Sequence, residues 1–256
     1  MTELKHIGRI KISGTLKALT GLHVGGTSVG LEIGGADNTI VRNGLDGRPY
    51  IPGSSLKGKM RCLLARVYTP GQLEEQRGSH FPRLFKLTRK EEYEDPSKSF
   101  LFHIFGVTPE EIRKLGGESL PTRLIVRDAM MTDETAEALE RSLYTDMPMT
   151  QVKTEVVIDR ITSQANPRQM ERVPAGAEFT YELVFNVFFE SDLTFLPYVA
   201  EAMELLENDY LGGQGSRGYG QVRFETRHVD VVSFNGTELA SNDQVVNFKE
   251  TVERGA

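Results

Sequence analysis

The segment LGGQGSRGYGQ, residues 211–221, places five glycines around one arginine and decides between two kinds of fold. It contains Gly213-x-Gly215-x-x-Gly218, the spacing of a dinucleotide-binding fingerprint. That fingerprint needs a strand before the glycines and a helix after them, because the helix N-terminus holds the pyrophosphate. Here residues 193–209 have helical spacing of apolar side chains, and residues 219–234 favour a strand. The sequence therefore excludes this fingerprint and leaves two readings, an anion-binding loop or a helix C-cap with a tight turn.

The elements on either side of this loop predict an α+β fold. Residues 7–19 alternate as a half-buried strand, and Ser54 or Ser55 can cap a helix with an apolar stripe. Residues 122–131 and 177–189 read as two further strands. The order β-α-β-β-α-β is that of the ferredoxin-like (RRM-like) fold, interrupted by insertions at 68–121 and 143–176. The stripe of the first helix comprises Leu56, Met60, Leu63, Leu64 and Val67.

The second insertion includes VKTEVVIDRITSQANPRQMERVPAG, residues 152–176, which predicts an extended hairpin. Asn166-Pro167 breaks the pattern near its middle, so we expect the chain to reverse there, with Met170 supplying an apolar tip. An arm carrying Arg160, Arg168 and Arg172 could wedge between bases and grip a nucleic-acid backbone. The alternative is a surface hairpin closed by ordinary ion pairs.

Composition narrows the class of protein. The chain has 256 residues, a net charge of −6 and one cysteine, Cys62, which excludes internal disulfides and cysteine-rich zinc clusters. No hydrophobic run suggests secretion or membrane insertion, so we expect a cytoplasmic protein without a membrane partner. Residues 42–66 nevertheless carry +5 against −11 for the remainder, and one basic stripe is enough for binding nucleic acid.

Cations gather at the start of the first helix. Lys57, Lys59 and Arg61 lie within little more than one turn of Ser54 and Ser55, an arrangement that can bind phosphate. A solvated helix face would give the same pattern. The histidines of the first insertion lack the cysteine or carboxylate spacing of a zinc site, so no structural metal is predicted.

Five stretches together carry a family resemblance: GLHVGG (21–26), GGADNTIVRN (34–43), PYIPGSSLKGKMRCLLA (49–65), EVVIDRITSQANPRQMERVPAG (155–176) and LLENDYLGGQGSRGYGQVRF (205–224). In this order they resemble the RAMP-superfamily backbone subunits of type III-A CRISPR effector complexes, which bind guide RNA and cut target RNA. The resemblance fails mainly in 68–121 and after about Phe234.

The resemblance implies a division of the chain. A ferredoxin-like palm would comprise 1–67, 122–142 and 177–235, with a catalytic loop at 21–38 and the glycine-rich loop at 211–220. A lid would occupy 68–121, a projecting thumb 143–176 and a C-terminal tail 236–256. Further copies of the chain would stack along the crRNA beside other subunits of the complex. Each thumb would displace a nucleotide, and the complementary single-stranded target RNA would be cut once per subunit in a reaction dependent on Mg²⁺ or another divalent cation.

The resemblance also implies site residues. The catalytic aspartate falls on Asp37, which would act as general base on the 2′-hydroxyl or hold the metal ion; the sequence does not choose. Without the resemblance, Ala36-Asp37-Asn38 reads as a turn. The implied RNA contacts are His23, Ser54, Ser55, Lys57, Lys59, Arg61, Arg160, Asn166, Arg168, Arg172, Gly213, Gly215, Ser216, Arg217 and Gly218.

Two other functions stay open at this point. The chain could be a scaffold that binds RNA while another subunit cuts, in which case Asp37 is a turn residue. It could instead be an enzyme that holds a small phosphorylated ligand in its two glycine-rich loops. RNA that purifies with the protein would distinguish this last function from the other two.

Overall fold

A computed structural model describes residues 5–26, 38–68, 96–107, 113 and 121–254. Its main sheet has the strand order β2-β4-β7-β1-β8, with β3 also paired to β7, and every pairing is antiparallel. The fold is thus a mixed α/β fold with an antiparallel sheet. The strands are β1 (Gly8–Ala18), β2 (Tyr50–Ile51), β3 (Leu124–Val126), β4 (Ala129–Met131), β7 (Glu178–Val187) and β8 (Val222–Ser233).

Alternating side chains of β1 and β7 build the core, as the sequence predicted. Every second residue of β7 is buried against the helices, and so is every second residue of β1 except Gly14, where the register with β8 shifts. The opposite sides of these strands carry cross-strand ion pairs, Lys11 with Glu182 at 2.8 Å and Lys17 with Glu178 at 3.0 Å. One face of the sheet therefore forms the core and the other is polar. The core side chains are Ile10, Ile12 and Leu16 from β1 and Phe179, Tyr181, Leu183, Phe185 and Val187 from β7.

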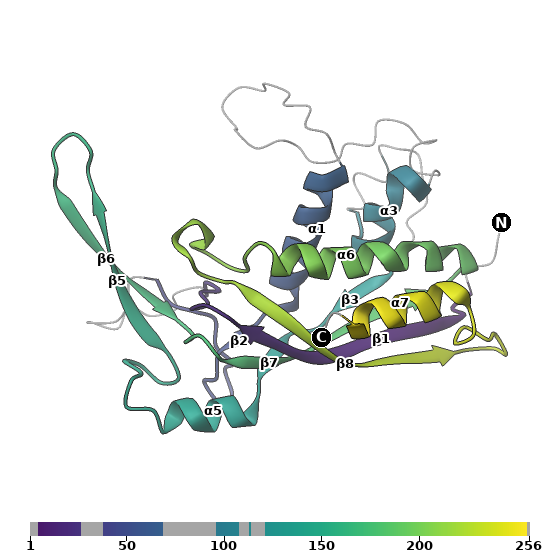
Figure 1. Cartoon of the computed structure of the whole chain (residues 1–256), viewed down its shortest axis with the longest axis horizontal. Helices are drawn as coiled ribbons and strands as arrows, with labels where there is room; N and C mark the ends of the chain where they lie inside the picture. Colours follow the sequence, from purple (N-terminus) through teal and green to yellow (C-terminus); the bar gives the residue numbers. More distant parts are fainter. Residues whose placement is uncertain (1–4, 27–37, 69–95, 108–112, 114–120, 255–256) are drawn as a thin grey trace.

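Helices cover the apolar face of the sheet (Figure 1). The predicted stripe of α1 (Gly53–Tyr68) is buried except at Val67, which is 53% exposed. The predicted helix before the glycine loop is α6 (Leu196–Glu207), preceded by the 3-10 helix η1 (Glu190–Phe195). A further helix, α7 (Asp243–Arg254), packs on α6 and β8 through Val245, Phe248 and Val252, in a segment from which we expected only a tail. The shorter α3 (Pro96–Phe105) and α5 (Asp133–Glu140) complete the set.

The predicted strand 122–131 is split into β3 and β4 where α1 begins. A Cβ atom on Gly53 would lie 2.2 Å from the Val126 carbonyl oxygen, so only glycine allows the helix to start this close. The Asp128 carboxylate accepts the Gly53 N–H at 2.7 Å. The break thus seats the N-terminus of α1, which carries the predicted phosphate-binding cations.

A buried ion pair joins β3 to η1. Arg123 and Asp192 are 2% and 3% exposed, and the Arg123 Nε and NH2 groups both lie 3.1 Å from Asp192 Oδ1. The other carboxylate oxygen accepts the N–H groups of Phe188 and Phe189 at 2.9 and 3.1 Å. Arg123 NH1 donates to the Pro121 carbonyl oxygen at 2.9 Å. Both charges are therefore paired and hydrogen-bonded, as burial requires.

The predicted hairpin exists and projects away from the sheet (Figure 1). It consists of β5 (Gln151–Ile158) and β6 (Ala165–Arg172). The predicted reversal at Asn166-Pro167 is wrong, because the chain reverses over residues 159–164. There the Asp159 carboxylate accepts the N–H groups of Ile161 and Thr162, both at 2.8 Å, which forms the turn and lowers the pKa of Asp159.

Met170 is not the apolar tip of the hairpin. It is buried at the base, where its sulfur accepts a hydrogen bond from the Asn38 side-chain amide at 3.2 Å. The exposed apolar side chains are instead Val156, Ile158 and Ile161, toward the outer end.

Candidate nucleic-acid interface

Three segments that are distant in the sequence meet at the base of the hairpin. Residues 21–26 pair with the end of the hairpin, because Leu22 and Val173 exchange backbone hydrogen bonds at 2.9 and 2.8 Å. The same residues bind the glycine-rich loop: the Gly213 N–H donates to the His23 carbonyl oxygen at 2.8 Å, and the Gly220 N–H donates to that of Gly21 at 3.0 Å. The structure therefore brings together three of the predicted RNA-binding regions.

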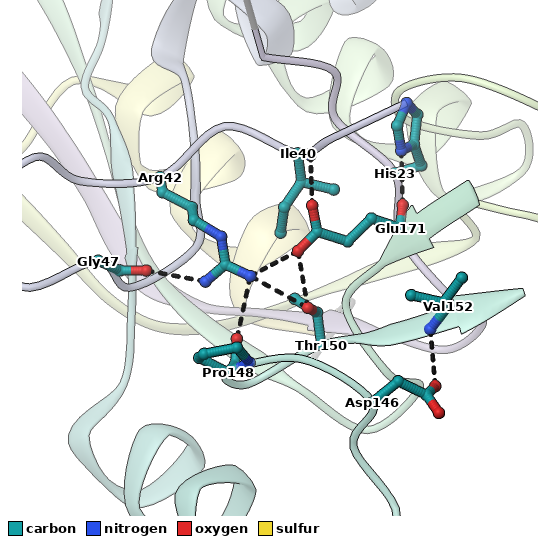
Figure 2. Close-up of polar contacts among 9 residues, drawn as sticks. All are labelled: His23, Ile40, Arg42, Gly47, Asp146, Pro148, Thr150, Val152 and Glu171. Atoms are coloured by element: carbon teal, nitrogen blue, oxygen red, sulfur yellow. Dashed lines mark hydrogen bonds and ion pairs between the residues drawn. The ribbon is translucent and has the colours of Figure 1, made fainter. Parts of the chain in front are cut away.

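His23 lies at this junction and is buried. Its Nδ1 atom is 2.7 Å from the Glu171 carbonyl oxygen (Figure 2), and because a carbonyl only accepts, Nδ1 carries the proton. Nε2 makes no hydrogen bond with a described residue. A Cβ atom on Gly213 would approach the ring to 3.2 Å. His23 thus has a structural role through its Nδ1 atom, and its Nε2 atom has no hydrogen-bond partner among the described residues.

A buried carboxylate that the sequence analysis missed fixes the base of the hairpin (Figure 2). Glu171, 1% exposed, accepts hydrogen bonds from Arg42 NH2 at 2.5 Å, Thr150 Oγ1 at 2.7 Å and the Ile40 N–H at 3.0 Å. Arg42 also donates to the carbonyl oxygens of Gly47 and Pro148. This network joins residues 38–42 to β6 and to residues 148–150, which lead into β5. Sequence reasoning counted Arg42 only as part of a basic stripe.

Six of the ten backbone N–H groups of residues 211–220 already donate to a backbone carbonyl oxygen. Besides Gly213, the N–H groups of Arg217 and Gly218 donate to carbonyl oxygens within the loop, both at 2.9 Å. Those of Gly215 and Ser216, which begin the 3-10 helix η2 (Gly215–Arg217), have no acceptor among the described residues. Only part of the predicted cradle is therefore available to an anion.

Two glycines of the loop are required by close contacts. Gly212 has φ +78°, and a Cβ atom there would lie 2.2 Å from the His23 carbonyl oxygen. A Cβ atom on Gly215 would lie 2.1 Å from the ring of Tyr210. Without side chains, these two glycines let the loop turn tightly and pack against His23 and Tyr210.

Five side chains form a hairpin-foot cluster between β5, β6 and the glycine-rich loop: Lys153, Glu155, Arg172, Arg217 and Tyr219. Lys153 Nζ lies 3.6 Å from Glu155 Oε1, and Arg217 Nε lies 3.8 Å from Glu155 Oε2. The Tyr219 ring has Lys153 Nζ 4.7 Å and the Arg172 guanidinium carbon 5.1 Å from its centroid. Two of the predicted RNA-binding arginines, Arg172 and Arg217, thus belong to one cluster, in which Lys153 contacts both Glu155 and Tyr219.

The cations of α1 differ in what they contact. Lys59 Nζ lies 2.9 Å from Asp209 Oδ2 and 3.6 Å from the centroid of the Tyr210 ring, so this lysine ties α1 to the start of the glycine-rich loop. Lys57 makes no ion pair with a described residue. Burial, together with the neighbouring Arg61, lowers the pKa of Lys57. Of these two lysines, only Lys59 is paired with a carboxylate among the described residues.

Other predicted residues stand apart from this junction. Arg160, Asn166 and Arg168 are exposed along the hairpin, and Ser54 is exposed at the start of α1. Asp37 lies outside the described residues, as does much of the predicted lid and part of the predicted catalytic loop. Within the described ranges, no three His, Cys, Asp or Glu side chains are grouped to hold a metal ion. No helix among the described residues is long and apolar enough to span a membrane.

Comparison with known proteins assigns the family. The family model described as "RAMP superfamily" matches residues 15–223, most of the chain. A curated protein of Methanocaldococcus jannaschii, named "CRISPR system Cms endoribonuclease Csm3", is 39% identical over 228 residues, which are 88% of this chain and 82% of that protein. The chain belongs to the Csm3 family of the RAMP superfamily.

Solved structures of Csm3 proteins agree with this assignment. The structure described as the "Csm3-Csm4 subcomplex in the type III-A CRISPR-Cas interference complex" matches with a TM-score of 0.51 and 27% identity, over 97% of both chains. The crystal structure of Methanopyrus kandleri Csm3 matches with a TM-score of 0.59 over 90% of this chain and 78% of that one. At 24% identity, this second match concerns the fold alone.

Proposed function

We propose that this chain is a backbone subunit of a type III-A CRISPR interference complex that binds guide crRNA and cleaves complementary target RNA at regular intervals. The observation that carries the proposal is the 39% identity, over most of both chains, to a protein named as an endoribonuclease. Further copies of the chain and other subunits of the complex are its partners. A Csm3–Csm4 pairing is documented for the structural relative.

The palm of this subunit is a ferredoxin-like sheet. The chain order β1, α1, β3 and β4, β7, α6, β8 supports this arrangement, as does the sheet order in which β1 lies between β7 and β8. An RRM binds RNA by stacking bases on aromatic side chains of its open sheet face. No described strand residue on the polar side of β1 or β7 is Phe or Tyr. RNA is bound instead at the hairpin and glycine-rich loop.

Cleavage uses the 2′-hydroxyl of the target as nucleophile: its oxygen bonds to the adjacent phosphorus, the P–O5′ bond breaks, and the products are a 2′,3′-cyclic phosphate and a 5′-hydroxyl, whose oxygen takes a proton from water. The hairpin acts as a thumb that displaces a nucleotide and lets the backbone bring the 2′-hydroxyl in line with the scissile phosphate. Positioning effects of this kind are worth about 7–11 kcal/mol in favourable cases. Asp37 then takes the proton of the 2′-hydroxyl or binds a divalent cation, since a carboxylate oxygen suits both tasks. When bound, Mg²⁺ would stabilise the negative charge that develops on the phosphate.

The test is cleavage of end-labelled complementary RNA by complexes assembled with guide RNA and the full chain. We expect cuts at regular spacing with Mg²⁺ and none with EDTA, while binding persists in both. Intact target in every condition, with binding retained, would make the chain a scaffold. Cutting unaffected by EDTA would remove the metal from the proposal, and absence of RNA binding would overturn the function as a whole.

Lys57 and Lys59 give a matched pair for the guide contacts. Replacing Lys57 with methionine should weaken guide-RNA binding and reduce the slope of log K against log salt by about 0.7, because one phosphate contact is lost. Replacing Lys59 with methionine should instead lower the thermal unfolding temperature, because this lysine binds Asp209 and Tyr210 within the protein. Salt-dependent filter binding and thermal unfolding measure the two effects. Equal salt slopes for Lys57→Met and the wild type would contradict the assignment.

A further inference from the structure

The hairpin-foot cluster holds an anion that is poorly bonded. The Glu155 side chain is 13% exposed, and its two closest cations stand 3.6 and 3.8 Å away, beyond hydrogen-bond distance. Its Oε1 atom is buried and has no hydrogen-bond partner among the described residues. A buried carboxylate normally accepts several hydrogen bonds, because losing water is costly for a charge. Glu171, a short distance along the same hairpin, has them, and Glu155 does not.

The hydroxyl group of Tyr219, next to Glu155, also lacks good hydrogen bonds. The residue is 1% exposed, and its buried hydroxyl has no hydrogen-bond partner within the part of the chain that the structure describes. Burial, followed by the neighbouring Glu155 carboxylate, raises the pKa of Tyr219 to about 12, so the phenol stays neutral and keeps its proton. The ring faces two cations, Lys153 and Arg172. The Tyr219 hydroxyl therefore lies beside the Glu155 carboxylate and the Arg172 guanidinium without a hydrogen bond of good geometry to either.

The charge balance of the cluster favours a second anion. Lys153, Arg172 and Arg217 carry three positive charges against the single negative charge of Glu155. Arginine and lysine bind a phosphodiester through short charge-assisted hydrogen bonds, which the long contacts to Glu155 do not provide. An incoming phosphate would therefore gain stronger bonds than the carboxylate gives up.

We propose that Glu155 is an internal counter-anion that holds Lys153 and Arg217 until an RNA phosphodiester replaces it. The inference rests on the proposed function, because it takes the ligand to be guide RNA. It adds Lys153 and Tyr219 to the phosphate site of Arg172 and Arg217. Glu155 then opposes RNA binding, although it lies within the RNA-binding surface, and sets how strongly the hairpin foot holds the guide.

The test is the salt dependence of guide-RNA binding by the full chain with Glu155→Gln. Glutamine keeps the shape and removes the charge, so at least one cation is freed for phosphate. The slope of log K against log salt should steepen by about 0.7, which corresponds to roughly fivefold tighter binding at 0.1 M salt. In Glu155→Gln/Lys153→Gln/Arg217→Gln, which keeps neither of the two cations, this steepening should disappear. The control Glu178→Gln, which breaks the Lys17–Glu178 pair on the sheet, should leave the slope unchanged.

The outcomes separate this inference from the proposed function. The inference alone is overturned if the wild type binds guide RNA and Glu155→Gln binds it no more tightly, with the same slope of log K against log salt. Absence of RNA binding by every variant, including the wild type, would overturn the proposed function and the inference with it. Thermal unfolding of each variant establishes that a change in binding does not come from loss of the fold.

Discussion

Replacing Asp37 with alanine is expected to slow target-RNA cleavage about 10²–10⁴-fold, the range for removing a general acid or base. Guide-RNA affinity should stay the same, because the implied guide contacts lie on other residues. The reason for so large an effect is that the proposed chemistry relies on one carboxylate. Single-turnover cleavage of end-labelled target by assembled complexes, with binding measured in parallel, gives both quantities.

Asp46 offers a matched control. It is an aspartate of the same connecting region, and its carboxylate accepts the Arg48 N–H at 3.1 Å. Replacing Asp46 with alanine removes a loop aspartate without touching the proposed chemistry, so cleavage should stay at the wild-type rate. Equal cleavage by the Asp37→Ala and wild-type complexes would show that Asp37 is a turn residue and that cutting depends on another group.

Replacing Asp192 with alanine is expected to lower the free energy of unfolding by about 3–5 kcal/mol. The variant leaves the Arg123 guanidinium buried without its anion, and it strands the N–H groups of Phe188 and Phe189. Such a loss is a large part of the stability of a typical domain. Urea unfolding followed by circular dichroism measures it.

The exposed pair Glu137–Arg141 provides the comparison. Its side chains are 61% and 81% exposed and lie one helical turn apart in α5. Replacing Glu137 with alanine should cost no more than about 0.5 kcal/mol, as expected for a solvated pair on a helix. If Asp192→Ala and Glu137→Ala had similar effects, the Arg123–Asp192 pair would not be the internal support that its burial indicates.

The parts of the fold that the sequence predicted are those with a strict local period. Alternation in β1 and β7 and the stripe of α1 each report which face is buried. The prediction of a tail over 236–256 overlooked such a period in α7, where Val245, Phe248 and Val252 recur at i, i+3 and i+7. The turn of the hairpin was misplaced because Asn166-Pro167 is a strong general turn signal. The structure uses the Asp159 side chain for the reversal instead.

For the candidate site, the sequence predicted which segments take part but not the ion pairs and hydrogen bonds that their side chains form. Spacing indicated that Arg172, Arg217 and Lys59 could bind phosphate, and it could not show which cations already have an anion. Lys59 is paired with Asp209, whereas Lys57, two residues away, is unpaired among the described residues. The role of Glu171 depends on Arg42 and Thr150, respectively 129 and 21 residues away, and no local pattern encodes that meeting.

Hydrogen bonds of Asn38 tie the residue that follows Asp37 to the base of the hairpin. The Asn38 carbonyl oxygen accepts the Glu171 N–H at 3.1 Å, and its side chain donates to Met170 in the same strand. Asn38 directly follows Asp37, so the proposed catalytic residue is one peptide bond from the hairpin's anchor. A force that tilts the hairpin is transmitted to that anchor. Under the proposed function, a change that loosens the base of the hairpin should therefore impair guide binding and cutting together.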